Sequence, residues 1–441
     1  MTKANHPLDT RNEKVAQDKL RVLFCDHLNL ARGKYIPMAH ATGESRFCQG
    51  IYALAYDKEL LPAPCSLLLE GLSDMIVRYD LDDLRGGWLG EEIVVIADQF
   101  DRNGNDLAVS GRTLLKNTAE QWQKLGYTAK AGIELEAYAF TRDCDGRWQP
   151  YDTPGAYVYG TGPFADPLGL TDSIYEQALA CGIPLEMITS EFDSPQFEFT
   201  LKYDDVLKAA DDAFLFRLMA REIALGKGVL LTFMPKPIEA LSGSGVHVNF
   251  SLWDTKGANS IGDTNSESRL SELGQACVAG LMHHHRGLAG LLAPCVNSYR
   301  RLQPASLSGY WCNWAIDHRG VTTRTTDEAG SSARIEHRMA DGAANIYSAI
   351  AAVLQASRLG LKNRYDLPPA ETADCLENHD ATVSVPENLG AAIEALEADG
   401  DLVNAVGPDL VGNLAEIKRY EIESTAPLSA DQLRDYYIHY I

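Results

Sequence analysis

The sequence predicts an α+β fold with two domains, and three observations carry that prediction. At 441 residues the chain is longer than the ~250–300 residues at which a single hydrophobic core stops growing. An apolar fraction of 45% and a charged fraction of 23% are ordinary for a globular protein. Strand-like and helix-like segments mix without the strict β-α-β rhythm of a doubly wound sheet. We expect a small sheet-rich domain at 1–110 and a larger domain at 111–441.

The smaller domain is expected to consist of short strands joined by turns. It follows the polar residues 1–17, with a short helix expected around 9–20. The apolar runs 21–25 and 92–97 have the composition of strands. The second run is followed by the turn-rich segment 101–105, which contains Asn and Gly.

The larger domain is expected to place long helices among strands. A helical pattern follows the boundary, an alanine-rich segment predicts a second helix, and two further helices have apolar periodicity. The expected helices are 111–125, 205–224, 269–292 and 345–361. Period-2 alternation predicts the strands. The expected strands are 131–140, 196–200, 229–233, 246–253 and 334–339.

Charge and cysteine content exclude several classes of protein. A net charge of −22 argues against nucleic acid and anionic membranes as partners, because a phosphate backbone requires a basic footprint. No apolar run approaches the ~18 residues of a transmembrane helix, and the N-terminal residues lack the apolar core of a signal peptide. The nine cysteines form no Cys-x-x-Cys pair. This favours reduced thiols in a cytoplasmic protein and argues against a cysteine-based zinc site.

The strand expected at 334–339 carries an informative charge pattern. Alternation places Arg334, Glu336 and Arg338 on one face, and Ile335, His337 and Met339 on the other. Two arginines that flank a carboxylate suit an anionic ligand beside a metal ion. A cross-strand salt-bridge ladder is the alternative for this motif on its own.

Other carboxylates share strand faces. Glu134 and Glu136 point the same way, so they require a shared cation or a raised pKa unless they face solvent. Glu191 lies on the loop that enters a second strand, and Glu198 follows seven residues later, opposite an apolar face. These spacings predict a cluster of oxygen ligands.

A glycine-rich turn at 242–245 leads into a strand on which His247, Asn249 and Ser251 share one face. Glycines at the entry let a ligand approach the backbone closely. Five glutamates and one histidine favour Mg²⁺ or Mn²⁺ over zinc or iron. The histidine run 283–285 is instead expected to form a partly exposed helix face without a metal, because successive helix positions diverge by about 100°.

Several arginines follow these carboxylates along the chain. Two metal ions beside arginines are suited to phosphoryl transfer from a nucleotide. The arginines are Arg300, Arg301, Arg319, Arg324, Arg334 and Arg338. No Gly-x-x-x-x-Gly-Lys-Ser/Thr motif occurs, which excludes a P-loop fold.

These motifs, in this order and over nearly the whole chain, resemble those of the glutamine synthetase family. The similar segments are Glu134-x-Glu136, Glu191 with Glu198, 233–237 with 243–247, 297–302, 334–338 and 364–369. The resemblance implies an N-terminal β-grasp domain and a catalytic domain in which helices surround a curved antiparallel sheet. It also implies a homo-oligomer, a double-ring dodecamer whose active sites are shared between neighbouring subunits.

The resemblance further implies a role for each site residue. One metal ion would be held by Glu136, Glu191 and Glu198, and the other by Glu134, His247 and Glu336. The glutamate substrate would contact Arg301, Arg338 and Gly243, while Arg319 and Arg324 would stabilise the phosphate during transfer. The nucleotide would be lined by Glu186, Asn249, Ser251, Arg324 and Arg334. The implied cofactors are ATP and two or three Mg²⁺ or Mn²⁺ ions per active site.

The implied reaction has two steps. ATP phosphorylates the γ-carboxylate of glutamate, and an amine then attacks the γ-glutamyl phosphate and expels phosphate. Activation is needed because a carboxylate is a poor electrophile, and metal ions and arginines offset the charge that develops.

The sequence departs from the family pattern where ammonium would bind. Leu307 occupies the position of a flap glutamate, and no aspartate occurs at 47–50, where the family has one in its N-terminal domain. Ser242 and Ser331 replace an asparagine and a lysine. An apolar side chain suits a substituted amine, so we expect a small alkylamine as substrate, with methylamine the first candidate. The last residue of note, Tyr365, matches a tyrosine that bacterial members adenylylate, and a buried structural role is expected for it here.

Four alternatives remain open from the sequence. The chain could be a glutamine synthetase that uses ammonia, or a γ-glutamyl polyamine or ethanolamine ligase. A guanidino kinase of the same fold is a more distant possibility. A catalytically inactive structural relative is disfavoured, because five carboxylates held together without a metal ion would repel one another.

Overall fold

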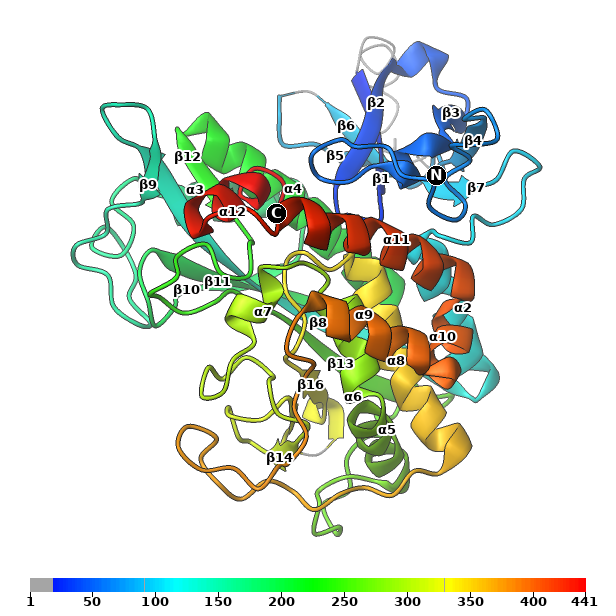
Figure 1. The fold of residues 1–441 in the computed structure, drawn as a ribbon, viewed down its shortest axis with the longest axis vertical. Helices are drawn as coiled ribbons and strands as arrows, with labels where there is room; N and C mark the ends of the chain where they lie inside the picture. Colours follow the sequence, from blue (N-terminus) through cyan, green and yellow to red (C-terminus); the bar gives the residue numbers. More distant parts are fainter. Residues whose placement is uncertain (1–18, 91, 329) are drawn as a thin grey trace, which may run out of the picture.

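The computed structural model describes residues 19–90, 92–328 and 330–441. Within them, two small sheets and one large sheet are accompanied by helices that pack on the large sheet (Figure 1). The helix expected at 9–20 lies outside the described residues, except that its last two positions belong to a strand. No described helix has both the length and the apolar character needed to cross a membrane.

Residues 19–100 form the two small sheets, which Figure 1 shows in blue and cyan. The first has the order β2-β1-β6-β5, with β1 parallel to β6, and the second is antiparallel with the order β3-β4-β7. The expected strands 21–25 and 92–97 are confirmed by β1 and β6. The domain boundary near residue 110 stays a prediction. The strands are β1 (Lys19–Cys25), β2 (Ala31–Pro37), β3 (Glu44–Cys48), β4 (Asp74–Arg78), β5 (Arg85–Gly86), β6 (Ile93–Ile96) and β7 (Asp98–Phe100).

The large sheet has the order β10-β11-β8-β13-β16-β15-β14, and β9 and β12 also pair with β8. Every pair is antiparallel except β14 with β15, which confirms the predicted fold class. The strands are β8 (Tyr127–Arg142), β9 (Trp148–Pro150), β10 (Leu185–Ser190), β11 (Gln196–Asp205), β12 (Val229–Thr232), β13 (Val246–Asp254), β14 (Trp314–Ile316), β15 (Thr323–Thr325) and β16 (Ile335–His337).

The α-helices that the structure describes lie in the part of the chain after residue 110. The expected helices at 111–125, 205–224 and 345–361 are confirmed by α2, α4 and α8, within two residues at each end. The helices are α2 (Gly111–Lys124), α3 (Leu170–Ala180), α4 (Val206–Gly226), α5 (Glu272–His283), α6 (His285–Leu292), α7 (Ser298–Arg301), α8 (Ile346–Asn363), α9 (Leu389–Ala398), α10 (Gly400–Val406), α11 (Pro408–Thr425) and α12 (Ala430–Tyr437).

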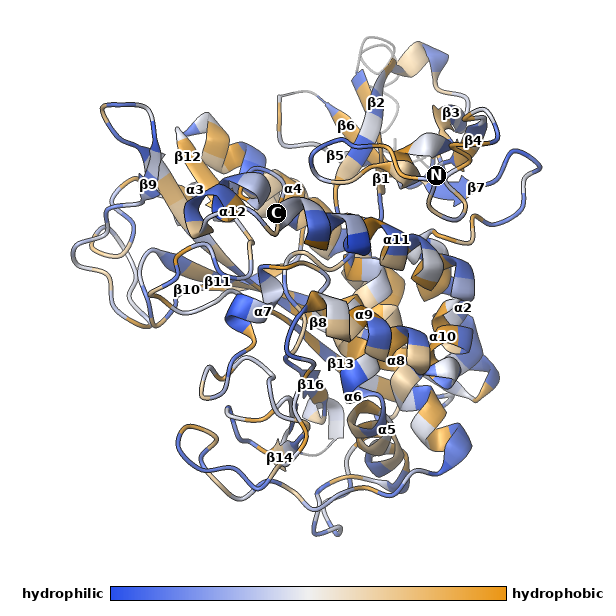
Figure 2. Ribbon diagram, viewed as in Figure 1, coloured by the Kyte–Doolittle hydropathy of each residue, from blue (hydrophilic) through white to orange (hydrophobic). Residues whose placement is uncertain are grey.

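Strand β8 separates the hydrophobic core from the polar face of the sheet. Its alternate residues Ala129 to Ala137 are at most 4% exposed and share a core with Trp122 of α2 and Phe216 of α4. Burial of such apolar area is the main term that holds a fold together, at roughly 25 cal/mol per Å². Figure 2 shows α8, which belongs to the same core, mostly in orange. The remaining alternate residues of β8 face the opposite side of the sheet.

The single helix expected at 269–292 is wrong, because α5 ends at His283 and α6 begins at His285. No proline or glycine marks position 284, so local sequence gives no sign of the break. His284 is 1% exposed and its Nδ1 lies 2.7 Å from Oδ2 of Asp399, a tertiary contact at the junction. His285 is also buried, so the expected partly exposed face is wrong for two of the three histidines.

Ser110 connects the end of the small sheets to α2. Its Oγ accepts a hydrogen bond from the backbone N–H of Thr113, as an N-cap of α2, and donates to Oε1 of Gln99. We expect Ser110→Ala to lower the free energy of unfolding by about 1–2 kcal/mol, because it removes a cap and leaves a buried amide oxygen unpaired. Urea denaturation at fixed protein concentration measures this. Ser429→Ala, which removes only the capping box of α12, is the control and should cost less; equal costs would contradict the role of Gln99.

Candidate active site

The polar face of the large sheet gathers the carboxylates that the sequence singled out. Strand pairing aligns β11, β8, β13 and β16 side by side, so residues distant in sequence become neighbours. The set consists of Glu134 and Glu136 on β8, Glu191 on the loop before β11, Glu198 on β11, His247 on β13 and Glu336 on β16.

The register fixes which of these side chains face one another. Glu198 lies directly opposite Glu136, and His247 lies directly opposite Glu134. Like charges directly opposite on antiparallel strands are unfavourable in the absence of a counter-ion. The strand pairing therefore creates a position that a cation would stabilise.

Two groups of ligand atoms meet the spacing of a metal site. Glu136, Glu191 and Glu198 form one group, and Glu134, Glu198 and His247 form the other, with the atoms of each group within 4.8 Å of one another. The structure thus brings together the first predicted set. It also gives Glu198 a place in both groups, which the sequence did not indicate.

In the second predicted set, Glu134 and Glu336 both approach His247, but Glu198 rather than Glu336 completes the group of ligand atoms within 4.8 Å of one another. Nδ1 of His247 lies 2.9 Å from Oε2 of Glu134 and 3.6 Å from Oε1 of Glu336, while Nε2 lies 3.4 Å from Oε1 of Glu136. The histidine therefore stands between three carboxylates from two other strands.

Mutual repulsion and burial perturb the pKa values in this cluster. Burial, together with Glu134, Glu191 and Glu136, raises the pKa of Glu198 to about 9. Burial and Glu136 likewise raise the pKa of Glu191. Burial acts in the same sense on Glu134, but its hydrogen bond and charge interaction with His247 outweigh burial and lower its pKa to about 2. A carboxyl that keeps its proton at neutral pH beside ionised neighbours is one that a divalent cation would deprotonate.

Glu336 lies between two arginines. Nη1 of Arg324 donates to Oε2 of Glu336 at 3.1 Å, and Nη1 of Arg338 donates to Oε1. The Nε atoms of both arginines are buried and have no hydrogen-bond partner among the described residues. Such N–H groups suit an anionic ligand next to the carboxylate cluster. The alternation predicted for 334–339 is confirmed, although the strand itself covers only the central three residues.

Arg301 has a different environment from Arg338. It is 3% exposed and donates to the backbone carbonyl oxygens of Met339 at 2.8 Å and Arg338 at 3.0 Å. Asp341 is also buried, and although burial raises its pKa to about 6, the nearby Arg301 charge acts to lower it. Arg301 therefore fixes the backbone that carries Arg338.

The glycine turn is built so that Arg301 can pass beneath it. A Cβ atom on Gly245 would lie 2.6 Å from Nη2 of Arg301 and 3.1 Å from Nε2 of His247. One on Gly243 would lie 2.5 Å from Cγ of Arg301. Asp193 anchors the start of the turn by accepting hydrogen bonds from the backbone N–H and the Oγ of Ser242, at 2.5 and 2.6 Å.

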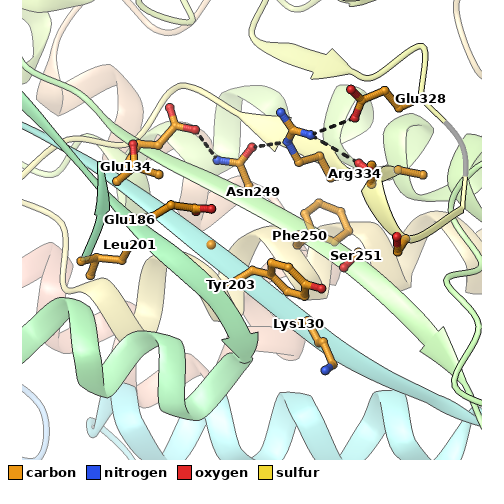
Figure 3. A pocket seen from close by; sticks show the side chains of 15 residues that line it. Lys130, Glu134, Glu186, Leu201, Tyr203, Asn249, Phe250, Ser251, Glu328 and Arg334 are labelled. Carbon is orange, nitrogen blue, oxygen red and sulfur yellow. Dashed lines mark hydrogen bonds and ion pairs between the residues drawn. The ribbon is translucent and has the colours of Figure 1, made fainter. Parts of the chain in front are cut away.

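A cavity of about 380 Å³ adjoins the cluster, and Glu134 belongs to both. Four predicted nucleotide contacts line it, namely Glu186, Asn249, Ser251 and Arg334 (Figure 3). The fifth, Arg324, does not line it and pairs with Glu336 instead. Asn249 bridges the two regions, since its Nδ2 donates to Oε1 of Glu134 at 2.9 Å while its Oδ1 accepts from Nε of Arg334 at 3.3 Å.

Two predicted residues lie on exposed segments. Arg319 is exposed on the turn between β14 and β15, and no ion pair joins it to another described residue. Leu307 is 42% exposed on the loop after α7. That loop is pinned, because Oγ of Ser308 donates to the carbonyl oxygen of Arg301 at 3.1 Å and Gly309 packs on the backbone of Met339.

Tyr365 is half-buried rather than buried. Its ring stacks on His283 with centroids 3.8 Å apart, and its hydroxyl accepts a hydrogen bond from Nδ2 of Asn363 at 2.6 Å. These contacts agree with the structural role expected for Tyr365. The expectation that its side chain is buried is wrong, because it is only half-buried.

Several residues that contact the site were not among those predicted from the sequence. Gln196 and Lys130 share strand faces with Glu198 and Glu134, so alternation alone could have identified them. Tyr203 also lines the cavity, but a register shift between Leu201 and Asp204 removes it from the period-2 pattern.

Comparison with known proteins gives a consistent result. The profile of the glutamine synthetase catalytic domain matches residues 108–436. The chain is 33% identical to a glutamine synthetase of Halobacterium salinarum over 92% of this chain and 90% of that protein. It is 31% identical to a glutamate–isopropylamine ligase of a Pseudomonas species, over 80% and 79% of the two chains.

Solved structures show the same relationship. The ligand-free form of GmaS superposes with a TM-score of 0.83 and 25% identity, covering 97% of this chain and 98% of that one. A GmaS–ADP complex gives a TM-score of 0.82 with the same identity and coverage. Together, the domain match, the sequence relatives and the shared fold show that this chain belongs to the glutamine synthetase family of ligases.

Proposed function

We propose that this protein is an ATP-dependent ligase that joins the γ-carboxylate of glutamate to a small alkylamine, with methylamine as the first candidate. The observation that carries the choice of amine is Leu307, an apolar side chain on a loop pinned beside the backbone of Arg338 and Met339. The likeness to GmaS and to an isopropylamine ligase supports the same choice.

The carboxylate cluster fits Mg²⁺ or Mn²⁺. Its donors are five carboxylates and one imidazole, and hard divalent cations prefer oxygen ligands. In the proposal, Glu136, Glu191 and Glu198 hold one ion, and Glu134, His247 and Glu336 hold a second. When bound, these ions supply positive charge to the phosphate oxygens of ATP and to the carboxylate under attack.

The remaining residues bind and orient the substrates. Asn249, Ser251, Glu186 and Arg334 position the nucleotide in the cavity they line. Arg338 binds the glutamate carboxylate that receives the phosphoryl group, and Arg324 stabilises the charge on that group. Arg301 and Gly243 support the amino acid through the strand end and the turn. We place Arg319 in the same role as Arg324, which requires its exposed loop to approach the phosphate.

The charge balance around the amine differs from that of an ammonium site. A carboxylate at position 307 would attract a small hydrated cation, whereas leucine offers only apolar contact. Each buried CH₂ contributes about 0.8 kcal/mol, or about fourfold in affinity. An alkyl group on the amine therefore gains binding energy that ammonia cannot.

We also propose that the protein works as a homo-oligomer, a double-ring dodecamer with shared active sites. Tyr157, Phe164 and Phe192 are each more than 75% exposed, and Phe192 directly follows Glu191. Exposed aromatic side chains of this size suit a surface that a partner covers.

The decisive experiment measures phosphate release with ATP, Mg²⁺ and glutamate, while the amine is varied. The set comprises ammonia, methylamine, ethylamine, ethanolamine and putrescine, and mass spectrometry identifies each product. We expect the highest kcat/KM with methylamine. Equal kcat/KM for ammonia would instead favour a glutamine synthetase, the second candidate, for which the 33% identity to the Halobacterium enzyme is the supporting observation.

Leu307→Glu is expected to move the preference towards ammonia. The ratio of kcat/KM for methylamine to that for ammonia should fall by about 10-fold, because the apolar contact is lost and a carboxylate is gained. Leu225→Glu, at an exposed leucine near the end of α4, is the control and should leave the ratio unchanged. An unchanged ratio in Leu307→Glu would show that this position does not face the amine.

A further inference from the structure

Gln196 connects three parts of the site that are far apart in sequence. It is the first residue of β11 and is 2% exposed. Its Nε2 lies 3.0 Å from the carbonyl oxygen of Gly243, 3.1 Å from Oγ of Ser244 and 3.4 Å from Oε2 of Glu136. One side-chain amide thus contacts both the glycine turn and a member of the carboxylate cluster.

These contacts decide which oxygen of Glu136 is available to a cation. Oε2 accepts a hydrogen bond from the backbone N–H of Gly245 at 2.8 Å, in addition to the contact with Gln196. Oε1 is directed towards Nε2 of His247, 3.4 Å away. Partners that hold one oxygen of a ligating carboxylate orient the other oxygen towards the ion.

The side chain of Gln196 is not needed to shape its own loop. The backbone N–H of Gln196 donates to the carbonyl oxygen of Asp193 at 3.1 Å, and the N–H of Glu191 donates to the carbonyl oxygen of Gln196 at 3.0 Å. Main-chain bonds therefore close the loop that carries Glu191. This leaves the buried amide group free to serve the contacts with the turn and with Glu136.

We propose that Gln196 is a positioning residue that couples binding of glutamate at the glycine turn to binding of the cation at Glu136. The amide nitrogen has two hydrogens for three acceptors, so the three contacts cannot all be strong at once. The contact with Glu136 is the longest of them. A ligand that engages the carbonyl oxygen of Gly243 changes the share of the amide available to Glu136 and so the orientation of the carboxylate. This inference rests on the proposed function, in which the turn at 242–245 holds glutamate.

The test compares Mn²⁺ binding with and without glutamate, using the EPR signal of free Mn²⁺. In the wild-type protein we expect glutamate to tighten Mn²⁺ binding by about 10-fold, and Mn²⁺ to tighten glutamate binding by the same factor, because such coupling is reciprocal. In Gln196→Met, an apolar replacement of similar length, the coupling factor should fall to within twofold of one. KM for glutamate should rise about 10- to 100-fold while KM for ATP stays within twofold.

Two further variants and a control separate coupling from damage to the fold. Gln196→Glu keeps the length of the side chain but removes the donor, so it should also lose the coupling. Ser244→Ala removes one acceptor on the turn and should alter the coupling factor without removing Gln196. Gln355→Met replaces another fully buried glutamine, on α8, whose Nε2 lies 2.9 Å from Oγ1 of Thr118 and 3.0 Å from Oε1 of Gln121, and it should retain the wild-type coupling.

Retention of the wild-type coupling factor in both Gln196 variants would overturn the proposal, as would the absence of coupling in the wild-type protein. Formation of γ-glutamylamide is measured separately by mass spectrometry. If the wild type forms that product and the Gln196 variants keep the coupling, only this inference fails. If the wild type forms no such product, the proposed function fails instead.

Discussion

Glu198→Gln is expected to lower kcat by at least ~10³-fold while raising the melting temperature of the metal-free protein at pH 8. The loss of activity follows from the place of Glu198 in both groups of ligand atoms, since one substitution removes a carboxylate from each group that could hold a cation. Charge stabilisation by a bound metal ion amounts to several kcal/mol, and about 4 kcal/mol corresponds to a factor of 10³ in rate.

The gain in stability follows from the raised pKa of Glu198, about 9 in the folded protein against 4.5 for an unperturbed glutamate. A raised carboxyl pKa means that the folded state holds a proton that the unfolded state has lost. The stability that this bound proton preserves is complete below pH 4.5 and is lost as the pH rises from 4.5 through 9. At pH 8 the folded protein therefore carries a free-energy penalty at Glu198. Glutamine is neutral and similar in shape, so it is free of this penalty at pH 8.

The measurement is thermal denaturation at pH 5 and pH 8, with EDTA or with Mn²⁺. We expect the variant to melt above the wild type at pH 8 in EDTA, by a few degrees, and below it in saturating Mn²⁺. At pH 5 the difference in EDTA should shrink. Glu176→Gln, at an exposed glutamate of α3, is the control and should follow the wild type. A variant that melts below the wild type in EDTA at pH 8 would contradict the assigned repulsion.

The carboxylate cluster could be anticipated from the sequence because strand alternation is a local property. Glu134 and Glu136 share a face of β8 by period 2 alone, and the same argument places Glu198 opposite Phe197 and Phe199. The pairing of Glu198 with both groups of ligand atoms depends on the register between β11 and β8. Register is set by tertiary pairing, so no local pattern contains it.

The arginines likewise include some whose position follows from local alternation and some whose position depends on tertiary structure. Alternation correctly placed Arg338, just after β16, on the same side as Glu336, and the structure adds Arg324 from β15 on the other side of the same carboxylate. The use of Arg301 to bind backbone carbonyl oxygens could not be foreseen, because its partners are main-chain atoms that follow β16. The sequence shows which arginines are present, whereas only the fold decides which of their N–H groups remain available to a ligand.

Helices were predicted where a long apolar run marks them and missed where the local pattern is weaker, even in α11, which has the same 18 residues as α8. The long helices α4 and α8 have extended apolar content and were found, whereas the break at His284 and the helices α9 to α12 were not. His284 illustrates the reason, because its contact with Asp399 joins residues 115 positions apart. A window of local sequence does not include such a partner.

Arg338→Ala is expected to lower kcat/KM for glutamate by about 10²- to 10³-fold and to change KM for ATP by less than threefold. The guanidinium is buried beside Glu336, and its Nε has no hydrogen-bond partner among the described residues, so the proposed carboxylate ligand is its natural acceptor. Removing one donor that stabilises developing charge costs about 2.7–4 kcal/mol in known cases. The backbone carbonyl oxygen of Arg338 still accepts from Arg301 in the variant, which preserves the strand end.

Arg338→Lys separates charge from geometry at the same position. Lysine restores the positive charge without the planar fork of donors, so it should recover only part of the lost kcat/KM. Arg319→Ala provides the comparison, because that residue lies on an exposed turn whereas Arg338 is buried beside Glu336, and it should cost less than Arg338→Ala. Steady-state kinetics with glutamate and ATP varied in turn, together with melting curves, distinguish these cases. Full recovery by lysine would reduce the role of Arg338 to a point charge, and a fall confined to KM for ATP would move it from the glutamate to the nucleotide.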